Sequence, residues 1–174
     1  MNTANRLTLL RIALIPVFLI ILYLSFPYSN WVALAVFIIA AITDLIDGHI
    51  ARSRNQVTDF GKFMDPLADK MLVVAAMCWF VQTGQMSGWV LALVLLREFA
   101  VSGMRLVAVE QGKVIAAAWS GKVKTFATMI CLIVMIVVNI NIINIISTVI
   151  IVGTTVYSGI EYFYVNRAVF KEAN

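Results

Sequence analysis

The sequence is poor in the residues that crosslink a chain, bind soft metals or interrupt helices. Its 174 residues include two cysteines, one histidine and three prolines, so we expect neither a disulfide framework nor a zinc-like site. Charged residues make up only 13% of the chain, far less than in a soluble domain. Because it also lacks a serine/glycine-rich or low-complexity stretch, we predict a single domain over residues 1–174 with no linker.

Apolar residues, in contrast, are abundant and are grouped in long runs. They account for 62% of the chain. Six segments are close to the roughly 20 residues that a bilayer-spanning helix requires: residues 8–26, 31–51, 66–82, 88–109, 124–140 and 143–164. The sequence therefore predicts an all-α, polytopic membrane protein with six transmembrane helices.

The positive charges alternate from one connection to the next. Residues 26–30, 82–88 and 139–144 carry no charge, whereas the remaining connections and both ends hold the basic residues. By the positive-inside rule, both termini and the basic connections face the cytoplasm. We predict a multi-pass protein of the inner (cytoplasmic) membrane, in which residues 52–62 form a short cytoplasmic turn. The net charge of +4 is explained by orientation and contact with membrane lipids, and we expect no nucleic-acid partner.

Four aspartates stand out against this apolar background. Asp44, Asp47, Asp65 and Asp69 follow the spacing D-x2-D-G-x2-A-R-x8-G-x3-D-x3-D. A carboxylate at bilayer depth costs about 2.5–3.5 kcal/mol or more, so such a cluster persists only with cations, water or metal beside it. On two helices, each pair would lie on one face, one turn apart. The predicted topology brings both pairs to the cytoplasmic side, where they form a candidate polar active site.

The chemistry of this cluster favours a hard divalent cation. Converging carboxylates repel one another unless they are neutralised, and ligation by oxygen alone suits Mg²⁺ or Mn²⁺. Mg²⁺ is usually held by a few carboxylates together with substrate phosphates, and two ions can stabilise both sides of a phosphoryl displacement. Gly48 and Gly61 would let a bulky ligand approach the backbone, and Arg52 offers a guanidinium suited to phosphate oxygens.

This motif resembles the defining motif of the CDP-alcohol phosphatidyltransferases, and every fixed position matches. The resemblance implies transfer of a phosphatidyl or smaller phospho-alcohol group from a CDP-alcohol to a hydroxyl, with release of CMP. It further implies that Asp44, Asp47 and Asp65 bind metal and that Asp69 is both a metal ligand and the general base. Gly48, Ala51 and Arg52 would contact the nucleotide and its phosphates. A homodimer is also implied by the family.

Sequence outside the motif bears on the acceptor. The segments 5–11, 97–99, 102–105 and 120–125 resemble bacterial members of the family that join CDP-diacylglycerol to glycerol 3-phosphate. Topology places Arg105, Lys122 and Lys124 on the active-site side, where they would either bind the acceptor phosphate or serve as ordinary cytoplasmic anchors. Asn5 and Thr8 share a helical face and would either contact the nucleotide or cap the helix.

One adjoining pair of charges lies inside a predicted span. Arg97 and Glu98 must be paired with each other or face a hydrated cavity. Either a structural role in closing the site or contact with substrate is compatible with their position.

Two other functions remain open on the sequence alone. The first is a transferase with another acceptor, such as serine, inositol phosphate or phosphatidylglycerol, which would not need Arg105 and Lys122 if the acceptor were uncharged or zwitterionic. The second is a cation transporter whose acidic residues form a conduction site. Transport requires a path across the bilayer, whereas the four carboxylates are predicted to gather at one face.

Overall fold

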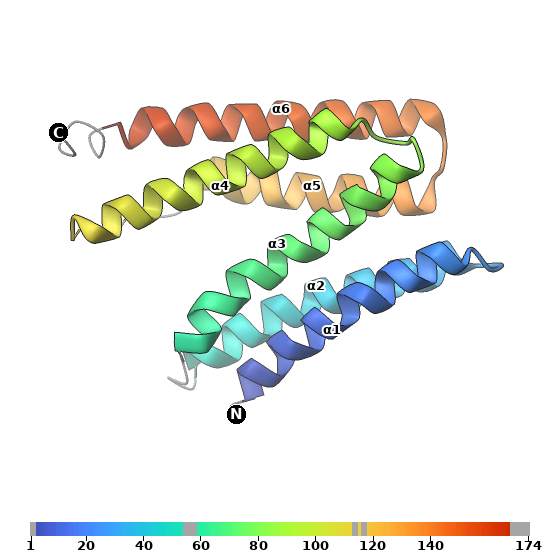
Figure 1. Ribbon diagram of the computed structural model, residues 1–174, viewed down its shortest axis with the longest axis horizontal. Helices are drawn as coiled ribbons and strands as arrows, with labels where there is room; N and C mark the ends of the chain where they lie inside the picture. Colours follow the sequence, from blue (N-terminus) through green and yellow to red (C-terminus); the bar gives the residue numbers. More distant parts are fainter. Residues whose placement is uncertain (1–2, 54–58, 113–114, 116–117, 168–174) are drawn as a thin grey trace. The chain divides into compact units, whose positions relative to one another are not determined.

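The computed structural model describes residues 3–53, 59–112, 115 and 118–167 of the chain, and the secondary structure in these ranges is entirely helical (Figure 1). The helices are α1 (Thr3–Leu24), α2 (Ser29–Ser53), α3 (Asp59–Gln82), α4 (Gly88–Glu110), α5 (Trp119–Val137) and α6 (Asn141–Val165). The prediction of an all-α protein is confirmed, and each of the six predicted segments coincides with one of these helices.

The helix ends differ from the predicted segments mainly on the side predicted to be cytoplasmic. α1 begins five residues before residue 8, and α5 begins five residues before residue 124. The prediction that residues 52–62 form a turn is wrong at both ends, because α2 continues to Ser53 and α3 already begins at Asp59. Hydropathy detects the apolar part of a helix, whereas backbone hydrogen bonding continues into polar sequence beyond it. The helical part of the motif is therefore longer than expected.

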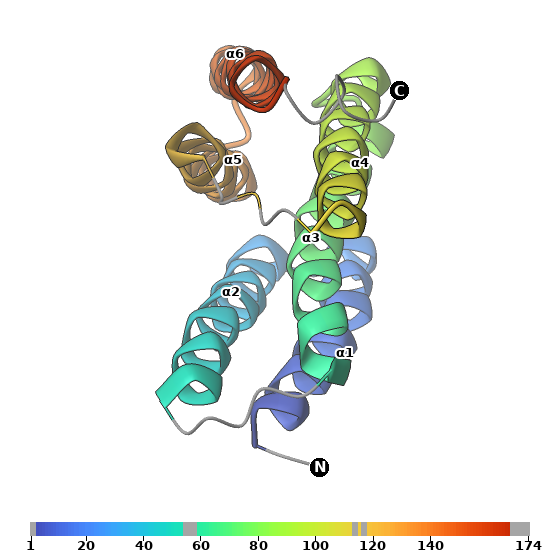
Figure 2. The same cartoon turned by 90° about the vertical axis from the view of Figure 1, so that its left-hand side faces the viewer.

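The first compact unit comprises α1, α2 and α3, together with residues 136–138 at the end of α5. In it α1 lies along α2 and also packs against α3, as both views show (Figures 1 and 2). The buried residues of α1 recur every three or four positions, which puts them on one face of the helix: Thr8, Arg11, Ile15, Phe18 and Leu22. The rings of Phe18 and Phe37 have their centroids 5.7 Å apart and join α1 to α2.

An aromatic pair joins α1 to α3 at the other end of this unit. The rings of Tyr23 and Trp79 meet edge to face, with centroids 4.9 Å apart, a favourable arrangement for aromatic side chains. The Tyr23 hydroxyl donates a hydrogen bond to Oε1 of Gln82 in the last turn of α3. This end of α3 therefore has a fixed place beside α1.

The second compact unit comprises α4, most of α5, and α6. The buried residues of α4 are Val90, Val94, Val101, Met104 and Ala108, and α4 packs against α6. The buried face of α6 is mostly small or polar: Asn144, Ser147, Ile151, Thr155, Ser158 and Tyr162. Small and hydroxyl-bearing residues allow close approach between membrane helices and can hydrogen-bond across their contact.

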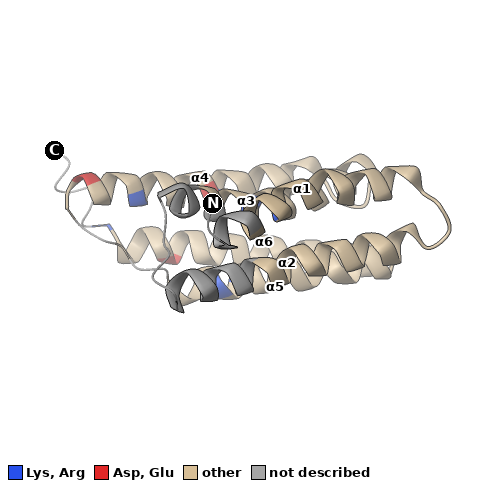
Figure 3. Ribbon diagram, turned by 90° about the horizontal axis from the view of Figure 1, so that it is seen from below, with Lys and Arg blue, Asp and Glu red and all other residues tan. Residues whose placement is uncertain are grey.

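The helices have the length and composition expected for a membrane. Among the described residues, those over Leu7–Leu24, Trp119–Val137 and Asn141–Val165 are long and apolar enough to cross a bilayer, and Ser29–Thr43 and Lys70–Gln82 are shorter apolar stretches. Lysine, arginine, aspartate and glutamate are sparse along the coloured parts of the helices (Figure 3). α4 is not among the three, because it contains Arg97, Glu98, Arg105 and Glu110.

Candidate active site

The aspartate motif lies on two helices of the first unit. Asp44 and Asp47 belong to the last three turns of α2, and Asp65 and Asp69 belong to the first three turns of α3. Because both pairs are in helices, the two members of each pair are about one turn apart. α2 and α3 also pack against each other within the unit. The side chains of the four aspartates lie outside the described residues, so their ligand roles stay a prediction.

The other motif residues flank the aspartates on the same helices. Gly48, Ala51 and Arg52 lie in the last turns of α2, and Gly61 lies in the first turn of α3. Their side-chain surroundings also lie outside the description. The helical backbone nevertheless places Gly48 and Arg52 one turn apart, since they are separated by four residues. A ligand bound at Asp44 and Asp47 would therefore lie close to both along α2.

α1 supplies two buried polar residues to this unit. Thr8 is 1% exposed and Arg11 is 0% exposed, three residues apart on the face that packs against α2 and α3. Asn5 precedes Thr8 by three residues, although its side chain is outside the description. The sequence predicts Arg11 only as one of the basic residues at the cytoplasmic N-terminus and as part of the segment 5–11, and its burial was missed. The available signal was its spacing from Thr8 and Ile15, which puts all three on one helical face.

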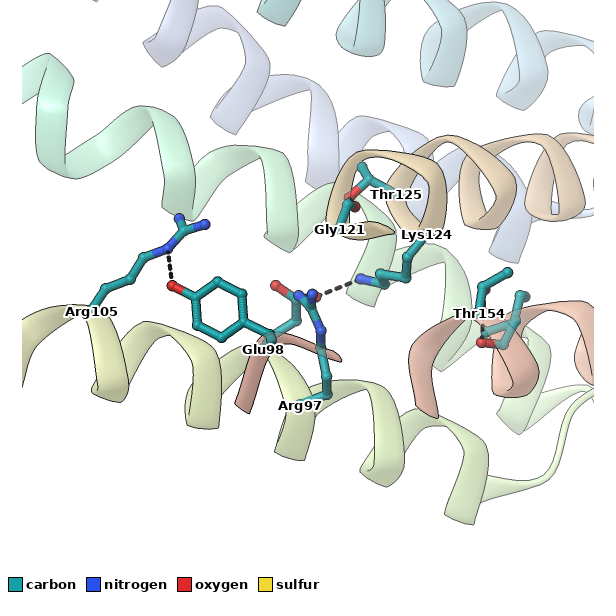
Figure 4. Close-up of polar contacts among 9 residues, drawn as sticks. Arg97, Glu98, Arg105, Gly121, Lys124, Thr125 and Thr154 are labelled. Atoms are coloured by element: carbon teal, nitrogen blue, oxygen red, sulfur yellow. Dashed lines mark hydrogen bonds and ion pairs between the residues drawn. The ribbon is translucent and has the colours of Figure 1, made fainter. Parts of the chain in front are cut away.

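In the second unit, a buried ion network joins α4 to α5 (Figure 4). Oε1 of Glu98 accepts hydrogen bonds from Nη1 of Arg97 at 3.1 Å and from Nζ of Lys124 at 2.5 Å. The three side chains are only 12%, 14% and 5% exposed for Arg97, Glu98 and Lys124, respectively. Burial makes the pairing important, because an uncompensated buried charge is strongly destabilising. Of the two alternatives for Arg97 and Glu98, pairing with each other or facing a hydrated cavity, the structure shows the pairing.

Two glycines give Arg97 the room it needs. Arg97 falls three residues after Val94 and four before Val101, so it shares the buried stripe of α4 with these valines. A Cβ atom added at Gly121 of α5 would lie 3.4 Å from Nη2 of Arg97, and one added at Gly159 of α6 would lie 3.4 Å from its Cγ. The arginine side chain thus passes against both neighbouring helices where neither has a side chain.

Arg105 and Lys122 have a different environment from Lys124. Nε of Arg105 donates a hydrogen bond to the hydroxyl of Tyr162 at 3.0 Å, and its guanidinium carbon lies 5.6 Å from the centre of that ring. Nζ of Lys122 lies 5.8 Å from the centre of the Trp119 ring. Both basic residues are exposed, unlike Lys124. Of the three predicted acceptor-binding residues, Arg105 and Lys122 are therefore accessible to a solute, while the Lys124 ammonium is already bound to Glu98.

Sequence reasoning missed the part played by Tyr162. This residue is 1% exposed, packs with Val101 and Met104, and holds the Arg105 side chain. Its spacing from Thr155 and Ser158 would have placed it on the buried face of α6. No pattern in the sequence, however, indicates that its hydroxyl meets an arginine 57 positions earlier in the chain.

Taken together, these observations define a helical membrane protein with an acidic motif on one helix pair and a buried, cationic network in a second set of helices. The family model described as CDP-alcohol phosphatidyltransferase matches residues 1–157. The chain belongs to that family, and it is accordingly a transferase of phospholipid biosynthesis.

Curated relatives resemble most or all of the chain. A CDP-diacylglycerol–glycerol-3-phosphate 3-phosphatidyltransferase of Bacillus subtilis (strain 168) is 40% identical over 191 aligned positions, which cover 99% of both chains. Enzymes with the same name from Salmonella typhimurium (strain LT2) and Escherichia coli (strain K12) are 45% and 43% identical over 136 positions, covering 75% of this chain and 74% of theirs.

Proposed function

We propose that this protein transfers the phosphatidyl group of CDP-diacylglycerol to glycerol 3-phosphate, giving phosphatidylglycerophosphate and CMP. The observation that carries the proposal is the intact aspartate motif on α2 and α3, in a chain that is 40% identical along nearly its whole length to an enzyme named for this reaction. Exposed cations at Arg105 and Lys122 support an anionic acceptor.

The donor set of the motif fits a divalent cation. Asp44, Asp47, Asp65 and Asp69 would hold Mg²⁺ or Mn²⁺, with two ions suggested by the number of carboxylates. All four belong to the packed helices α2 and α3, and oxygen-only ligation suits these hard ions. When bound, the metal would neutralise negative charge on the diphosphate of CDP-diacylglycerol and on the departing CMP.

The chain's own residues then position and activate the reactants. Asp69 accepts the proton of the glycerol 3-phosphate hydroxyl as its oxygen attacks the phosphorus that carries the diacylglycerol group. The bond from that phosphorus to the oxygen shared with the CMP phosphate breaks, and CMP leaves with the electron pair. Gly48, Ala51 and Arg52 bind the nucleotide end together with Asn5 and Thr8, and Gly61 leaves space for it.

The acceptor phosphate is bound by Arg105 of α4 and Lys122 of α5, with a contribution from Lys124, two residues after Lys122 on α5. Arg105 reaches its place through the Tyr162 hydroxyl, which occupies only Nε. The two terminal nitrogens of its guanidinium can therefore form the paired hydrogen bonds that phosphate oxygens favour.

The protein acts as a single domain in the inner membrane, with six spans and with both termini and the active site on the cytoplasmic side. Apolar helices and the alternation of charge between connections support this arrangement. Single cysteines at Ser53 and Ser87 should react with impermeant reagents from opposite sides of the membrane. Labelling of the Ser53 position from outside intact cells would contradict the orientation. A homodimer of this domain is also proposed, on family resemblance.

An acceptor screen tests the proposed reaction. Purified protein is given labelled CDP-diacylglycerol and, in separate assays, glycerol 3-phosphate, glycerol, serine, inositol phosphate or phosphatidylglycerol, and CMP release is measured. We expect glycerol 3-phosphate to be used far better than unphosphorylated glycerol, because glycerol lacks the anionic group that Arg105 and Lys122 bind. Equal use of serine or glycerol would contradict the acceptor assignment while leaving the family intact.

A further inference from the structure

A second site lies between α5 and α6 in the second unit, and none of the residues that line it is assigned above to catalysis. It is a cavity of about 250 Å³. Its walls are mainly apolar and aromatic and include Trp119, Ser120 and Val123 of α5 and Gly153, Tyr157 and Glu161 of α6. α5 begins at Trp119, and Glu161 lies four residues before the end of α6. The cavity is therefore close to one end of each helix.

Among the residues that the structure describes, two that line this cavity each carry a polar atom without a hydrogen-bond partner. Oγ of Ser120 is buried, in a residue that is only 7% exposed, and Oε2 of Glu161 is buried as well. Buried polar atoms in folded proteins are nearly always hydrogen-bonded, and an ionised oxygen without a donor is costly. A glutamate and a serine that line the same cavity, each with an unpaired oxygen, indicate a ligand with more than one N–H or O–H donor.

The charge and aromatic character of the cavity narrow the ligand to an ammonium group. The carboxylate of Glu161 would repel a phosphate or another carboxylate. Tyr157 is 65% exposed and offers its ring at the same site, where aromatic faces attract cations. The Trp119 ring, which lines the same cavity, already has one cation over it, the ammonium of Lys122. A primary ammonium can donate three hydrogen bonds, enough for both Ser120 and Glu161.

The surroundings of the cavity indicate that this ammonium belongs to a lipid. Exposed apolar side chains continue from it along both helices, at Val123 and Ile130 on α5 and at Ile150 and Ile146 on α6. Both helices are long and apolar enough to cross a membrane. Exposed Trp119 and Tyr157 at the cavity are of the types enriched at the membrane interface. An amphiphile with its headgroup in the cavity could lay its acyl chains along these rows.

We propose that the cavity between α5 and α6 binds the ammonium headgroup of an aminophospholipid such as phosphatidylethanolamine, through Glu161, Ser120 and Tyr157. Neither the proposed lipid substrate nor the proposed lipid product carries an ammonium group, so this is a separate lipid site. The proposal does not depend on the identity of the acceptor. It would make the transferase sensitive to the zwitterionic lipid around it.

Native mass spectrometry of the full chain in detergent tests the proposal. Equal amounts of phosphatidylethanolamine and phosphatidylcholine with the same acyl chains are added, and the lipid retained by the protein is counted. We expect about a tenfold preference for phosphatidylethanolamine, because the trimethylated headgroup of phosphatidylcholine has no N–H donor for the Glu161 carboxylate. Equal retention of the two lipids would overturn the proposal.

Matched variants test whether the preference for phosphatidylethanolamine arises at this cavity. Glu161→Gln should abolish it, Ser120→Ala should reduce it severalfold, and Glu110→Gln, which changes an exposed glutamate of α4 in the same unit, should leave it intact. Tyr157→Leu should also reduce the preference for phosphatidylethanolamine. Because Tyr157 is exposed, this variant should fold, and its lipid preference can be measured even if a substitution at Glu161 impairs folding. A preference that persists in both Glu161→Gln and Tyr157→Leu would place the lipid elsewhere.

Two further arms distinguish other sources of the ammonium group. Glycerophosphoethanolamine has the same headgroup without acyl chains, and we expect it not to displace the lipid at equal concentration. Displacement would mean that the cavity binds a small soluble amine, which would overturn the lipid assignment. Retention should also be the same in monomeric and dimeric fractions. A preference confined to monomers would instead identify the cavity as a contact between copies.

Discussion

The two three-helix units differ in the sign of the charge that they concentrate. In the first unit, α2 and α3 carry four aspartates of one motif, with Arg11 buried on the neighbouring α1. In the second unit, one carboxylate, Glu98, is shared by the two cations Arg97 and Lys124. The first arrangement concentrates negative charge for a cation, whereas the second leaves one positive charge in excess. The first cluster is therefore suited to binding a ligand, and the second to joining two helices.

The largest effect should come from removing the negative charge of the first unit. Asp69→Asn should lower the rate of CMP release by about 10²–10⁴-fold, because a general base is lost. CMP release should also be largely lost in three further variants, Asp44→Asn, Asp47→Asn and Asp65→Asn. Chelation of divalent metal should have the same effect. Glu110→Gln, outside both charge clusters, serves as the control and should retain activity. Full activity in excess chelator would contradict the metal assignment.

Removing the shared carboxylate of the second unit, Glu98, should instead affect stability. Glu98→Ala leaves the cations of Arg97 and Lys124 buried without their shared partner, which should destabilise the protein by about 3–5 kcal/mol. Thermal unfolding in detergent measures this effect. Lys124→Met added to Glu98→Ala should restore part of the loss, because one of the unpaired charges is then gone. Glu110→Ala should change little, and an equal loss in that control would show that the network has no special role.

A smaller effect is expected at the exposed cations of the second unit. Arg105→Ala should raise KM for glycerol 3-phosphate by about ten- to a hundredfold, since a charge-assisted contact is lost. The affinity for CDP-diacylglycerol should be nearly unchanged. Arg167→Ala is a matched control, because Arg167 also lies over a tyrosine ring, 5.1 Å from the centre of Tyr164. Equal KM changes in the two variants would indicate a general loss of positive charge and not acceptor binding.

The smallest effect concerns the space around Arg97. At Gly159 an alanine Cβ would only reach van der Waals contact with the arginine, so Gly159→Ala should be nearly neutral. Gly159→Leu should cost about 1–3 kcal/mol of unfolding free energy, because the larger side chain must displace Arg97. A Cβ atom added at Gly103 would meet no neighbouring side chain within 4 Å, and Gly103→Leu is the control in the same thermal measurement. Equal tolerance of leucine at both positions would contradict the steric role of Gly159.

The sequence alone predicts the helices well because apolar runs of spanning length have few alternatives in a bilayer. It predicts their ends less well, since Arg52 and Asp59 are polar yet helical. The aspartate motif was found from residue types and spacing within one short region. The contacts of Lys124 with Glu98 and of Arg105 with Tyr162 join positions 26 and 57 residues apart. Such pairs depend on how the helices pack against one another, and this packing cannot be predicted from the local spacing of residues.

The ion network has a consequence for how the chain enters the membrane. α4 contains Arg97 and Glu98 near its middle and is not among the helices apolar enough to span by composition. Alone in lipid, it would hold a charged pair whose insertion is unfavourable. Lys124 on α5 would face the same difficulty without Glu98. With α4 as one of the proposed spans, we expect its insertion to be coupled to that of α5 and α6, whose residues pair with or contact its charged side chains.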